Sequence, residues 1–260
     1  MELTIYQVDA FTNQRFKGNP AAVVPLNEWL PDAVLQDIAQ ENNLAETAYF
    51  VQEDDGFRLR WFTPAVEVDL CGHATVATAH VLYEHLGYNK DVIKFQSRSG
   101  LLTVEKRGTQ YLLNFPTDHI TKVENAPHLV EALGTAPVEL YQGKTDWMVV
   151  LEEQSQVENL KPDLRKIAEA GGRGTIVTAP GIEVDFVSRC FFPQSGVDED
   201  PVTGSAHTTL TPYWAKRLGK NKLHAKQISK RSGDLTLQLK GDRTEIGGEA
   251  VTYLVGKIFI

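Results

Sequence analysis

The chain has 260 residues, of which 42% are hydrophobic, and its formal net charge at pH 7 is -8. A chain of this length can bury one large core or two small ones, and two is the expectation. The negative charge disfavours nucleic acid and anionic membrane surfaces as partners, so an anionic ligand would need local hydrogen-bond donors. No apolar run reaches membrane-spanning length, and no basic segment followed by an apolar one stands at the start.

The first set of predicted elements opens with a strand over residues 4–11 and an apolar strand near Val24. A helix follows, because the Pro-Asp pair at residues 31–32 suits a first turn and the Asn-Asn pair at 42–43 ends it. The next elements are strands at residues 48–51 and 57–62, an apolar helix from Gly72 to Gly87, and a hairpin ladder of alternating residues.

The second set repeats this order. A strand at residues 138–141 and an apolar strand near Val149 precede a helix that begins at the Pro-Asp pair 162–163 and ends at the Gly-Gly pair 171–172. An interior proline predicts a kink in the long helix of this set. The remaining elements are strands at residues 175–178 and 184–192, a helix from Gly204 to Gly219 that contains Pro212, and a second ladder.

An ungapped shift of 132 residues relates the two sets. It aligns Cys-Gly-His-Ala at residues 71–74 with Thr-Gly-Ser-Ala at 203–206, and the Leu-Gly pair at 86–87 with that at 218–219. Further matches keep their order along the chain, which indicates an internal repeat.

The repeat predicts two homologous halves, residues 1–117 and residues 118–260. The helix that follows Gly72 is apolar on most sides, which favours a helix enclosed by a sheet. We therefore predict an α/β (α+β) fold of two pseudo-symmetric halves, each an open barrel-like, mostly antiparallel sheet around a central helix.

Each of the two long helices begins at a glycine, Gly72 or Gly204. A helix start presents free backbone N–H groups and the positive end of the helix dipole, which together bind carboxylate or phosphate. We expect the two starts to face one cleft and to bind a small anionic metabolite; alternatively, the glycines only permit tight packing. The predicted binding residues are Gly72, His73, Ala74, Gly204, Ser205 and Ala206.

Glu46 is the candidate general acid/base. It lies between the end of a predicted helix and an apolar strand, where the repeat has only Gly174 and Thr175. Desolvation of a carboxylate at such a position would raise its pKa towards the range useful for proton transfer. The alternative is an exposed charge at a strand end.

Two further residues near the helix starts are candidates for catalysis. His73 is predicted to relay a proton or donate a hydrogen bond, and Asp200 to orient His73; alternatively, they are ordinary helix-start and turn residues. His73 and His80 are seven residues apart, and no acidic residue shares that helix face at metal-ligand spacing, so no metal site is expected.

The cysteines argue against thiol chemistry and for a reducing environment. Only Cys71 and Cys190 occur, which is neither a disulfide framework nor a zinc-site pattern, and we expect a cytoplasmic protein. A two-base racemase needs an acid/base in each half, but Thr203 stands where a partner for Cys71 would be.

Other common catalytic motifs are missing. Neither phosphate-binding glycine motif occurs; the Gly-Gly-Arg-Gly segment at residues 171–174 comes closest, and we interpret it as a loop. Ser205 has no nucleophile-elbow motif, which disfavours serine hydrolysis.

Five motifs together resemble those of the PhzF-like family of phenazine-biosynthesis isomerases, and the resemblance runs nearly end to end. Each motif alone would not be specific. They are Val8-Asp9-Ala10-Phe11-Thr12, Gly18-Asn19-Pro20-Ala21-Ala22-Val23, Asn43-Leu44-Ala45-Glu46-Thr47-Ala48, Cys71-Gly72-His73-Ala74-Thr75 and Asp200-Pro201-Val202-Thr203-Gly204-Ser205-Ala206.

The resemblance implies a fold similar to that of diaminopimelate epimerases and an isomerase that uses no cofactor. The family's acid/base glutamate matches Glu46, and its supporting histidine, aspartate and serine match His73, Asp200 and Ser205. The best-known members isomerise a dihydro-hydroxyanthranilate and are dimers, so the resemblance also implies a homodimer. It implies proton-transfer isomerisation more firmly than phenazine synthesis.

The leading hypothesis is a cofactor-independent isomerase that moves a proton on a small carboxylic-acid metabolite, with Glu46 as general acid/base. The alternatives are an epimerase of the same fold that uses Cys71, and a catalytically silent metabolite-binding protein. The threonine at position 203 counts against the first alternative. The joint presence of the four matched residues counts against the second.

Overall fold

The computed structural model describes residues 1–260. The chain divides into two compact units: unit 1 comprises Met1–Asn114 together with Gly247–Ile260, and unit 2 comprises Phe115–Ile246. The first boundary lies close to residue 117, where the repeat places it. The C-terminal segment, however, belongs to unit 1, which the repeat does not predict.

Unit 1 is a mostly antiparallel sheet with two helices, α1 (Asp32–Asn42) and α2 (Gly72–His85). Both helices were predicted from the sequence at nearly these bounds. The strands of unit 1 are β1 (Glu2–Ala10), β2 (Asn19–Leu26), β3 (Glu46–Glu53), β4 (Gly56–Phe62), β5 (Glu67–Val68), β6 (Val92–Ser97), β7 (Gly100–Arg107), β8 (Gln110–Pro116) and β18 (Ala250–Phe259).

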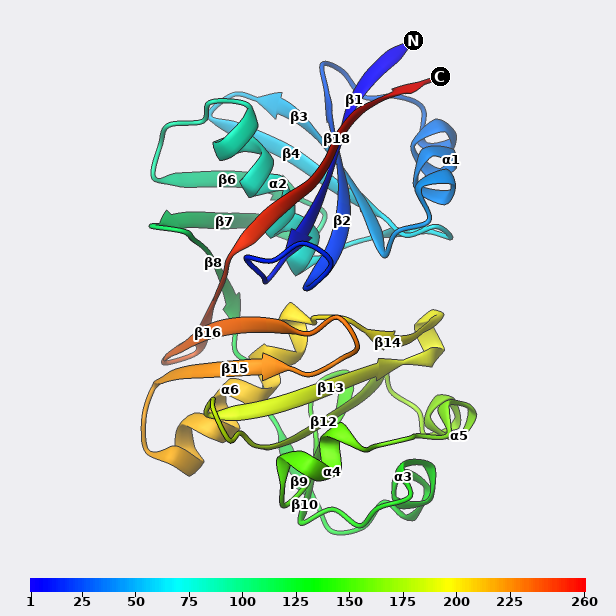
Figure 1. Ribbon diagram of the computed structural model, residues 1–260, viewed down its shortest axis with the longest axis vertical. Helices are drawn as coiled ribbons and strands as arrows, with labels where there is room; N and C mark the ends of the chain where they lie inside the picture. The colour runs from blue at the N-terminus through cyan, green and yellow to red at the C-terminus, as the bar shows by residue number, and fades with distance from the viewer. The chain divides into compact units, whose positions relative to one another are not determined.

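Helix α2 is the central element of unit 1. Every residue from His73 to Leu82 is buried, and the helix packs against β1, β2 and β3 (Figure 1). Small side chains such as Ala74 and Ala77, which are fully buried, allow this close approach of helix and sheet. The prediction of an apolar helix enclosed by a sheet is confirmed.

Strand β18 explains why the end of the chain belongs to unit 1. It pairs antiparallel with β1 from Glu2 opposite Phe259 to Ala10 opposite Ala250, and Figure 1 draws it in red beside the blue β1. Without β18, that edge of β1 would present unpaired N–H and C=O groups. The long-range pairing therefore covers an edge of the sheet with residues from the far end of the chain.

Unit 2 contains one long helix, α6 (Gly204–Leu218), and several short ones. None of the helices of the chain is both long and apolar enough to span a membrane. The remaining elements of unit 2 are β9 (Thr121–Val123), α3 (Pro127–Leu133), β10 (Glu139–Gln142), β11 (Asp146–Val150), α4 (Gln154–Glu158), α5 (Leu164–Glu169), β12 (Gly174–Pro180), β13 (Phe186–Phe192), the 3-10 helix η1 (Pro193–Ser195), β14 (Val197–Asp200), β15 (Lys222–Gln227), β16 (Gly233–Lys240) and β17 (Arg243–Gly248).

The strand pairings of the two units follow the same order. In unit 1, β1–β2 is antiparallel, β2–β3 parallel, β3–β4 and β4–β5 antiparallel, β4–β6 parallel and β6–β7 antiparallel. In unit 2, the corresponding series is β10–β11, β11–β12, β12–β13, β13–β14, β13–β15 and β15–β16, with identical directions. The predicted fold of two similar mixed α/β halves is confirmed, although α3 and α4 have no counterpart in unit 1.

Helix α6 continues without interruption through Pro212. Proline lacks an N–H, so the carbonyl of Thr208, four residues earlier, loses its helical partner. Asp118 donates its backbone N–H to that carbonyl at 3.2 Å, and the Asp118 carboxylate accepts a hydrogen bond from the Thr209 hydroxyl at 2.9 Å. A loop outside the helix thus compensates for the hydrogen bond that proline removes.

Candidate active site

The turn after α1 fixes the position of Glu46. Asn43 ends the helix in the left-handed conformation, with φ of 47°, and Asn42 donates its side-chain amide to the Thr47 hydroxyl at 3.1 Å. Glu46 then begins β3, opposite Ala21 of the parallel strand β2. Its side chain is only 17% exposed, so the carboxylate is largely shielded from water.

His73, the second residue of α2, lies against Glu46. Its Nε2 is 3.0 Å from Oε2 of Glu46, but neither atom makes a well-directed hydrogen bond to any partner. On the other side of the ring, Nδ1 lies 3.2 Å from the side-chain amide nitrogen of the fully buried Asn19. Unit 1 therefore brings together the two residues that the sequence analysis proposed as acid/base and proton relay.

The surroundings of His73 favour its charged form. Burial by itself lowers the pKa of His73, but the adjacent Cys71 sulfur and the Glu46 carboxylate raise it, and the net pKa is well above its ordinary value. An imidazolium offers an N–H donor to the carboxylate at Nε2. The two side chains are therefore close enough to share a proton.

Cys71 also lies beside His73. Its sulfur is 3.5 Å from Nδ1 of the imidazole, and the residue is 6% exposed. Burial, reinforced by the Glu46 carboxylate, raises the pKa of the Cys71 thiol to about 11. The thiolate is the reactive form of cysteine, so this thiol is a poor base at neutral pH.

Three side chains of unit 1 that could bind a metal ion lie close together. The donor atoms of Glu46, Cys71 and His73 all lie within 4.8 Å of one another. His80, which the sequence places seven residues after His73, is not part of this group and contacts the Tyr111 and Thr252 hydroxyls at 3.0 and 2.8 Å. Oxygen, sulfur and nitrogen donors suit Zn²⁺, although the raised pKa of Cys71 opposes the deprotonation that such binding requires.

Asp200 lies in unit 2, where it is held at the start of α6. Its carboxylate accepts a hydrogen bond from the Thr203 hydroxyl at 2.5 Å. The fully buried Gln227 accepts from the Thr203 N–H at 2.8 Å and donates to the Asp200 carbonyl at 2.7 Å. These bonds fix the segment that precedes Gly204.

Arg173 contacts a predicted binding residue but was not itself predicted from the sequence. Its NH2 group donates to the hydroxyl of Ser205, the second residue of α6, at 3.1 Å. Its Nε and NH2 donate to the two carboxylate oxygens of Asp146, at 2.9 and 2.5 Å. The residues 171–174 were interpreted as a loop because they follow a predicted helix. One sequence signal could have identified Arg173. It lies two residues before the predicted strand 175–178, just as Glu46 lies two residues before the predicted strand 48–51.

The first turns of both long helices lack a side-chain cap. Neither Cys71 nor Thr203, the N-cap residues, forms a side-chain hydrogen bond to the helix. Gly72 and Ser205 are half-buried, while the other predicted binding residues are buried. The backbone N–H groups there belong to the set that a helix leaves unsatisfied.

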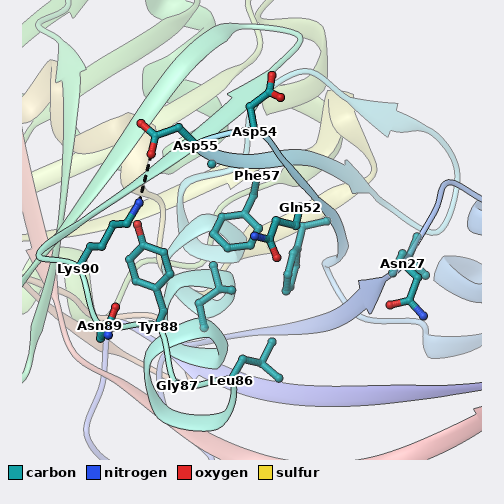
Figure 2. Close-up of a pocket in the computed structure, with 14 residues that line it drawn as sticks. Asn27, Gln52, Asp54, Asp55, Phe57, Leu86, Gly87, Tyr88, Asn89 and Lys90 are labelled. Atoms are coloured by element: carbon teal, nitrogen blue, oxygen red, sulfur yellow. Dashed lines mark hydrogen bonds and ion pairs between the residues drawn. The ribbon is translucent and has the colours of Figure 1, made fainter.

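A cavity of about 590 Å³ lies at the C-terminal end of α2 and is separate from these groups. Figure 2 shows Phe57, Tyr88 and Leu86 in its lining, with an ion pair of 3.1 Å between Asp55 and Lys90. A helix of the length of α2 extends roughly 20 Å. Because His73 is at the other end of the helix, this cavity does not hold the acid/base pair.

The chain is similar to known proteins along its whole length. The sequence profile of the family described as "Phenazine biosynthesis-like protein" matches residues 8–256. An "Uncharacterized isomerase" of Pseudomonas aeruginosa is 49% identical over 260 residues, which cover 100% of both chains. The crystal structure of a PhzF-family phenazine biosynthesis protein from Enterococcus faecalis is 47% identical, covers 100% of both chains and has a TM-score of 0.98.

A more distant structure shares the fold. The structure of a "Predicted Epimerase" from Pseudomonas aeruginosa is 18% identical, covers 99% of both chains and has a TM-score of 0.77. This structure confirms the epimerase-like fold that the motifs imply. The 49% identical relative confirms the assignment to the isomerases. The chain belongs to the PhzF family of phenazine biosynthesis-like isomerases.

Proposed function

We propose that the chain catalyses a cofactor-independent proton transfer on a small carboxylic-acid metabolite, with Glu46 as the general acid/base. The observation that carries this proposal is the 3.0 Å contact between Glu46 and His73, whose side chains are only 17% and 7% exposed. A shielded carboxylate beside an imidazole, at an uncapped helix start, contains the groups that proton transfer requires.

In the proposed reaction, the Glu46 carboxylate accepts a proton from a carbon atom of the substrate. The electron pair of that C–H bond moves into the adjacent unsaturated system, and the protonated Glu46 then returns the proton to another carbon of the same system. The protein ends in its starting protonation state. The Nε2 atom of His73 lies 3.0 Å from the carboxylate, so a small rotation of the ring lets its N–H donate to Glu46 and orient it. Backbone N–H groups of α2 stabilise the transient negative charge.

Thiol chemistry is the weaker candidate for the same residues. Cys71 is close to His73, as an epimerase would need, but its pKa of about 11 leaves little thiolate at neutral pH. A silent binding protein is the remaining alternative, and it would show no proton exchange with any ligand.

The test is deuterium incorporation from D₂O into a panel of small carboxylic and amino acids, followed by mass spectrometry. Glu46→Gln keeps the size of the side chain but cannot accept and return a proton, so exchange should fall by about 10²–10⁴-fold. Glu53→Gln is the matched control, because Glu53 is the exposed last residue of the same strand. It should exchange like the wild type.

Thermal melts must show that both variants are folded. Exchange by Glu46→Gln at the rate of the wild type would refute Glu46 as the acid/base. Absence of exchange in the wild type, across a panel that includes acids it binds, would favour the silent binding protein.

A further inference from the structure

The two units place different side chains near the start of equivalent strands. In unit 1, Glu46 begins β3 and contacts His73, the second residue of α2, at 3.0 Å. In unit 2, Arg173 immediately precedes β12 and contacts Ser205, the second residue of α6, at 3.1 Å. Because β3 and β12 occupy the same place in the series of strand pairings, the two contacts lie at the same end of equivalent strands, although the repeat aligns Glu46 with Gly174, the residue after Arg173.

The guanidinium of Arg173 is held rigidly. Asp146, which is 3% exposed, accepts two hydrogen bonds from it, and the ring of Phe192 lies 5.0 Å from its central carbon. Paired hydrogen bonds between arginine and a carboxylate fix the plane of the guanidinium. Despite burial, the Asp146 carboxylate keeps the pKa of Arg173 above its ordinary value, so the group stays charged.

The backbone at Arg173 is also constrained. Its N–H donates to the carbonyl of Thr145 at 2.7 Å. Gly172 has φ of +76°, and a Cβ atom there would lie 2.8 Å from that same carbonyl oxygen. A Cβ atom on Gly174 would lie 2.1 Å from the Phe192 ring. The glycines on both sides are therefore required for the path that brings Arg173 to Ser205.

Arg173 differs from the structural arginines of the chain. Arg60 and Arg189 are 15% and 14% exposed, and each uses Nε, NH1 and NH2 in hydrogen bonds to the protein. Arg173 is 39% exposed and uses only Nε and NH2. Its NH1 group remains available to a ligand.

The hydroxyl of Ser205 adds a second donor. Its oxygen accepts from Arg173, which leaves the O–H free to donate elsewhere. The NH1 group of Arg173 and this hydroxyl are thus two neighbouring donors, at the start of a helix, that donate to no protein acceptor. Such a pair suits the two oxygens of a carboxylate.

We infer that Arg173 is a further binding residue of the anion site that the sequence predicts at Ser205, and that its NH1 group binds the carboxylate of the substrate. This inference rests on the proposed isomerase function and specifies how the substrate is recognised. Asp146 is then a positioning residue, since it fixes the guanidinium without reaching the ligand.

The test uses benzoate as the probe, titrated into the full-length protein and followed by calorimetry. A lost hydrogen bond to a charged group corresponds to about tenfold or more in affinity, so Arg173→Gln should weaken binding by at least this factor. Benzamide, which has the same shape without the charge, should bind the wild type much more weakly than benzoate does. Arg165→Gln is the matched control, because Arg165 lies in α5 of the same unit and is 92% exposed.

Loss of Arg173 leaves the buried Asp146 without its cation, so this variant can lose stability as well. Ser205→Ala avoids that problem, because it removes the donor without touching Asp146, and it should also weaken benzoate binding. Glu46→Gln should bind benzoate like the wild type while it loses proton exchange, which separates this inference from the proposed function. Equal benzoate affinity in the wild type, Arg173→Gln and Ser205→Ala, or no benzoate binding by the wild type, would overturn the inference.

Discussion

Glu46 and Cys71 contact opposite nitrogens of one imidazole, the carboxylate 3.0 Å from Nε2 of His73 and the sulfur 3.5 Å from Nδ1. Both side chains are largely shielded from water. The carboxylate faces a histidine that tends to be protonated, whereas the thiol has its pKa raised to about 11. This arrangement favours carboxylate chemistry over thiol chemistry.

The first prediction concerns the reactivity of the thiol. Cys71→Ser should retain proton exchange within about threefold of the wild type, because a protonated thiol contributes little as a base. In the folded protein, Cys71 and Cys190 should react slowly with a thiol reagent such as dithionitrobenzoate at pH 7, since both are buried. Guanidinium chloride should make both react at once. Rapid labelling of the native protein together with an inactive Cys71→Ser would restore the thiol mechanism.

The second prediction is a pH dependence of stability. The pKa of His73 is raised in the folded protein above its value of about 6.5 in the unfolded chain. Its contribution is therefore fully present below pH 6.5 and is lost as the pH rises through the folded pKa. The difference in melting temperature between the wild type and His73→Asn should shrink from pH 6 upwards.

The control for this titration is His119→Asn, because His119 is exposed. Its melting temperature should follow that of the wild type at every pH. A difference between the wild type and His73→Asn that grows with rising pH would show that the sign of the pKa shift is wrong.

The third prediction compares two adjacent glycines before β12. Gly171 and Gly172 both have φ of +76°, but only at Gly172 would an added Cβ meet the protein, 2.8 Å from the Thr145 oxygen. Gly171→Ala should lower the free energy of unfolding by about 1–2 kcal/mol through backbone strain alone. Gly172→Ala should cost more, and only this change should also weaken benzoate binding. Urea denaturation measures the free energy of unfolding of the two variants. Equal losses would mean that the backbone at Thr145 moves away from the added methyl group at no cost.

The fourth prediction concerns metal ions. Proton exchange should survive dialysis against EDTA, because the Glu46 and His73 side chains contact each other directly and the Cys71 thiol is protonated at neutral pH. Metal content is followed by mass spectrometry in the same samples. An activity that EDTA abolishes and Zn²⁺ restores would instead assign Glu46, Cys71 and His73 as metal ligands.

The sequence by itself determined the elements and their repetition. Periodic apolar residues, the Asn-Asn pair at residues 42–43 and the Pro-Asp pairs are local signals, and they located α1, α2, α5 and α6. The 132-residue shift also indicated that the two halves share one fold, which the matching strand pairings confirm. Glu46 and His73 were identified as candidates because each lies at the start of a predicted element.

Only the tertiary structure decided which of these residues meet. The sequence pattern contains no signal for the contact of Glu46 with His73 and Cys71, because it depends on how α2 packs against the sheet. The role of Arg173 depends on Asp146, which comes from a neighbouring strand and reaches the arginine only through the parallel register of β11 and β12. The pairing of β18 with β1 joins the two ends of the chain. Such contacts arise from packing and register between distant segments, which local side-chain patterns do not encode.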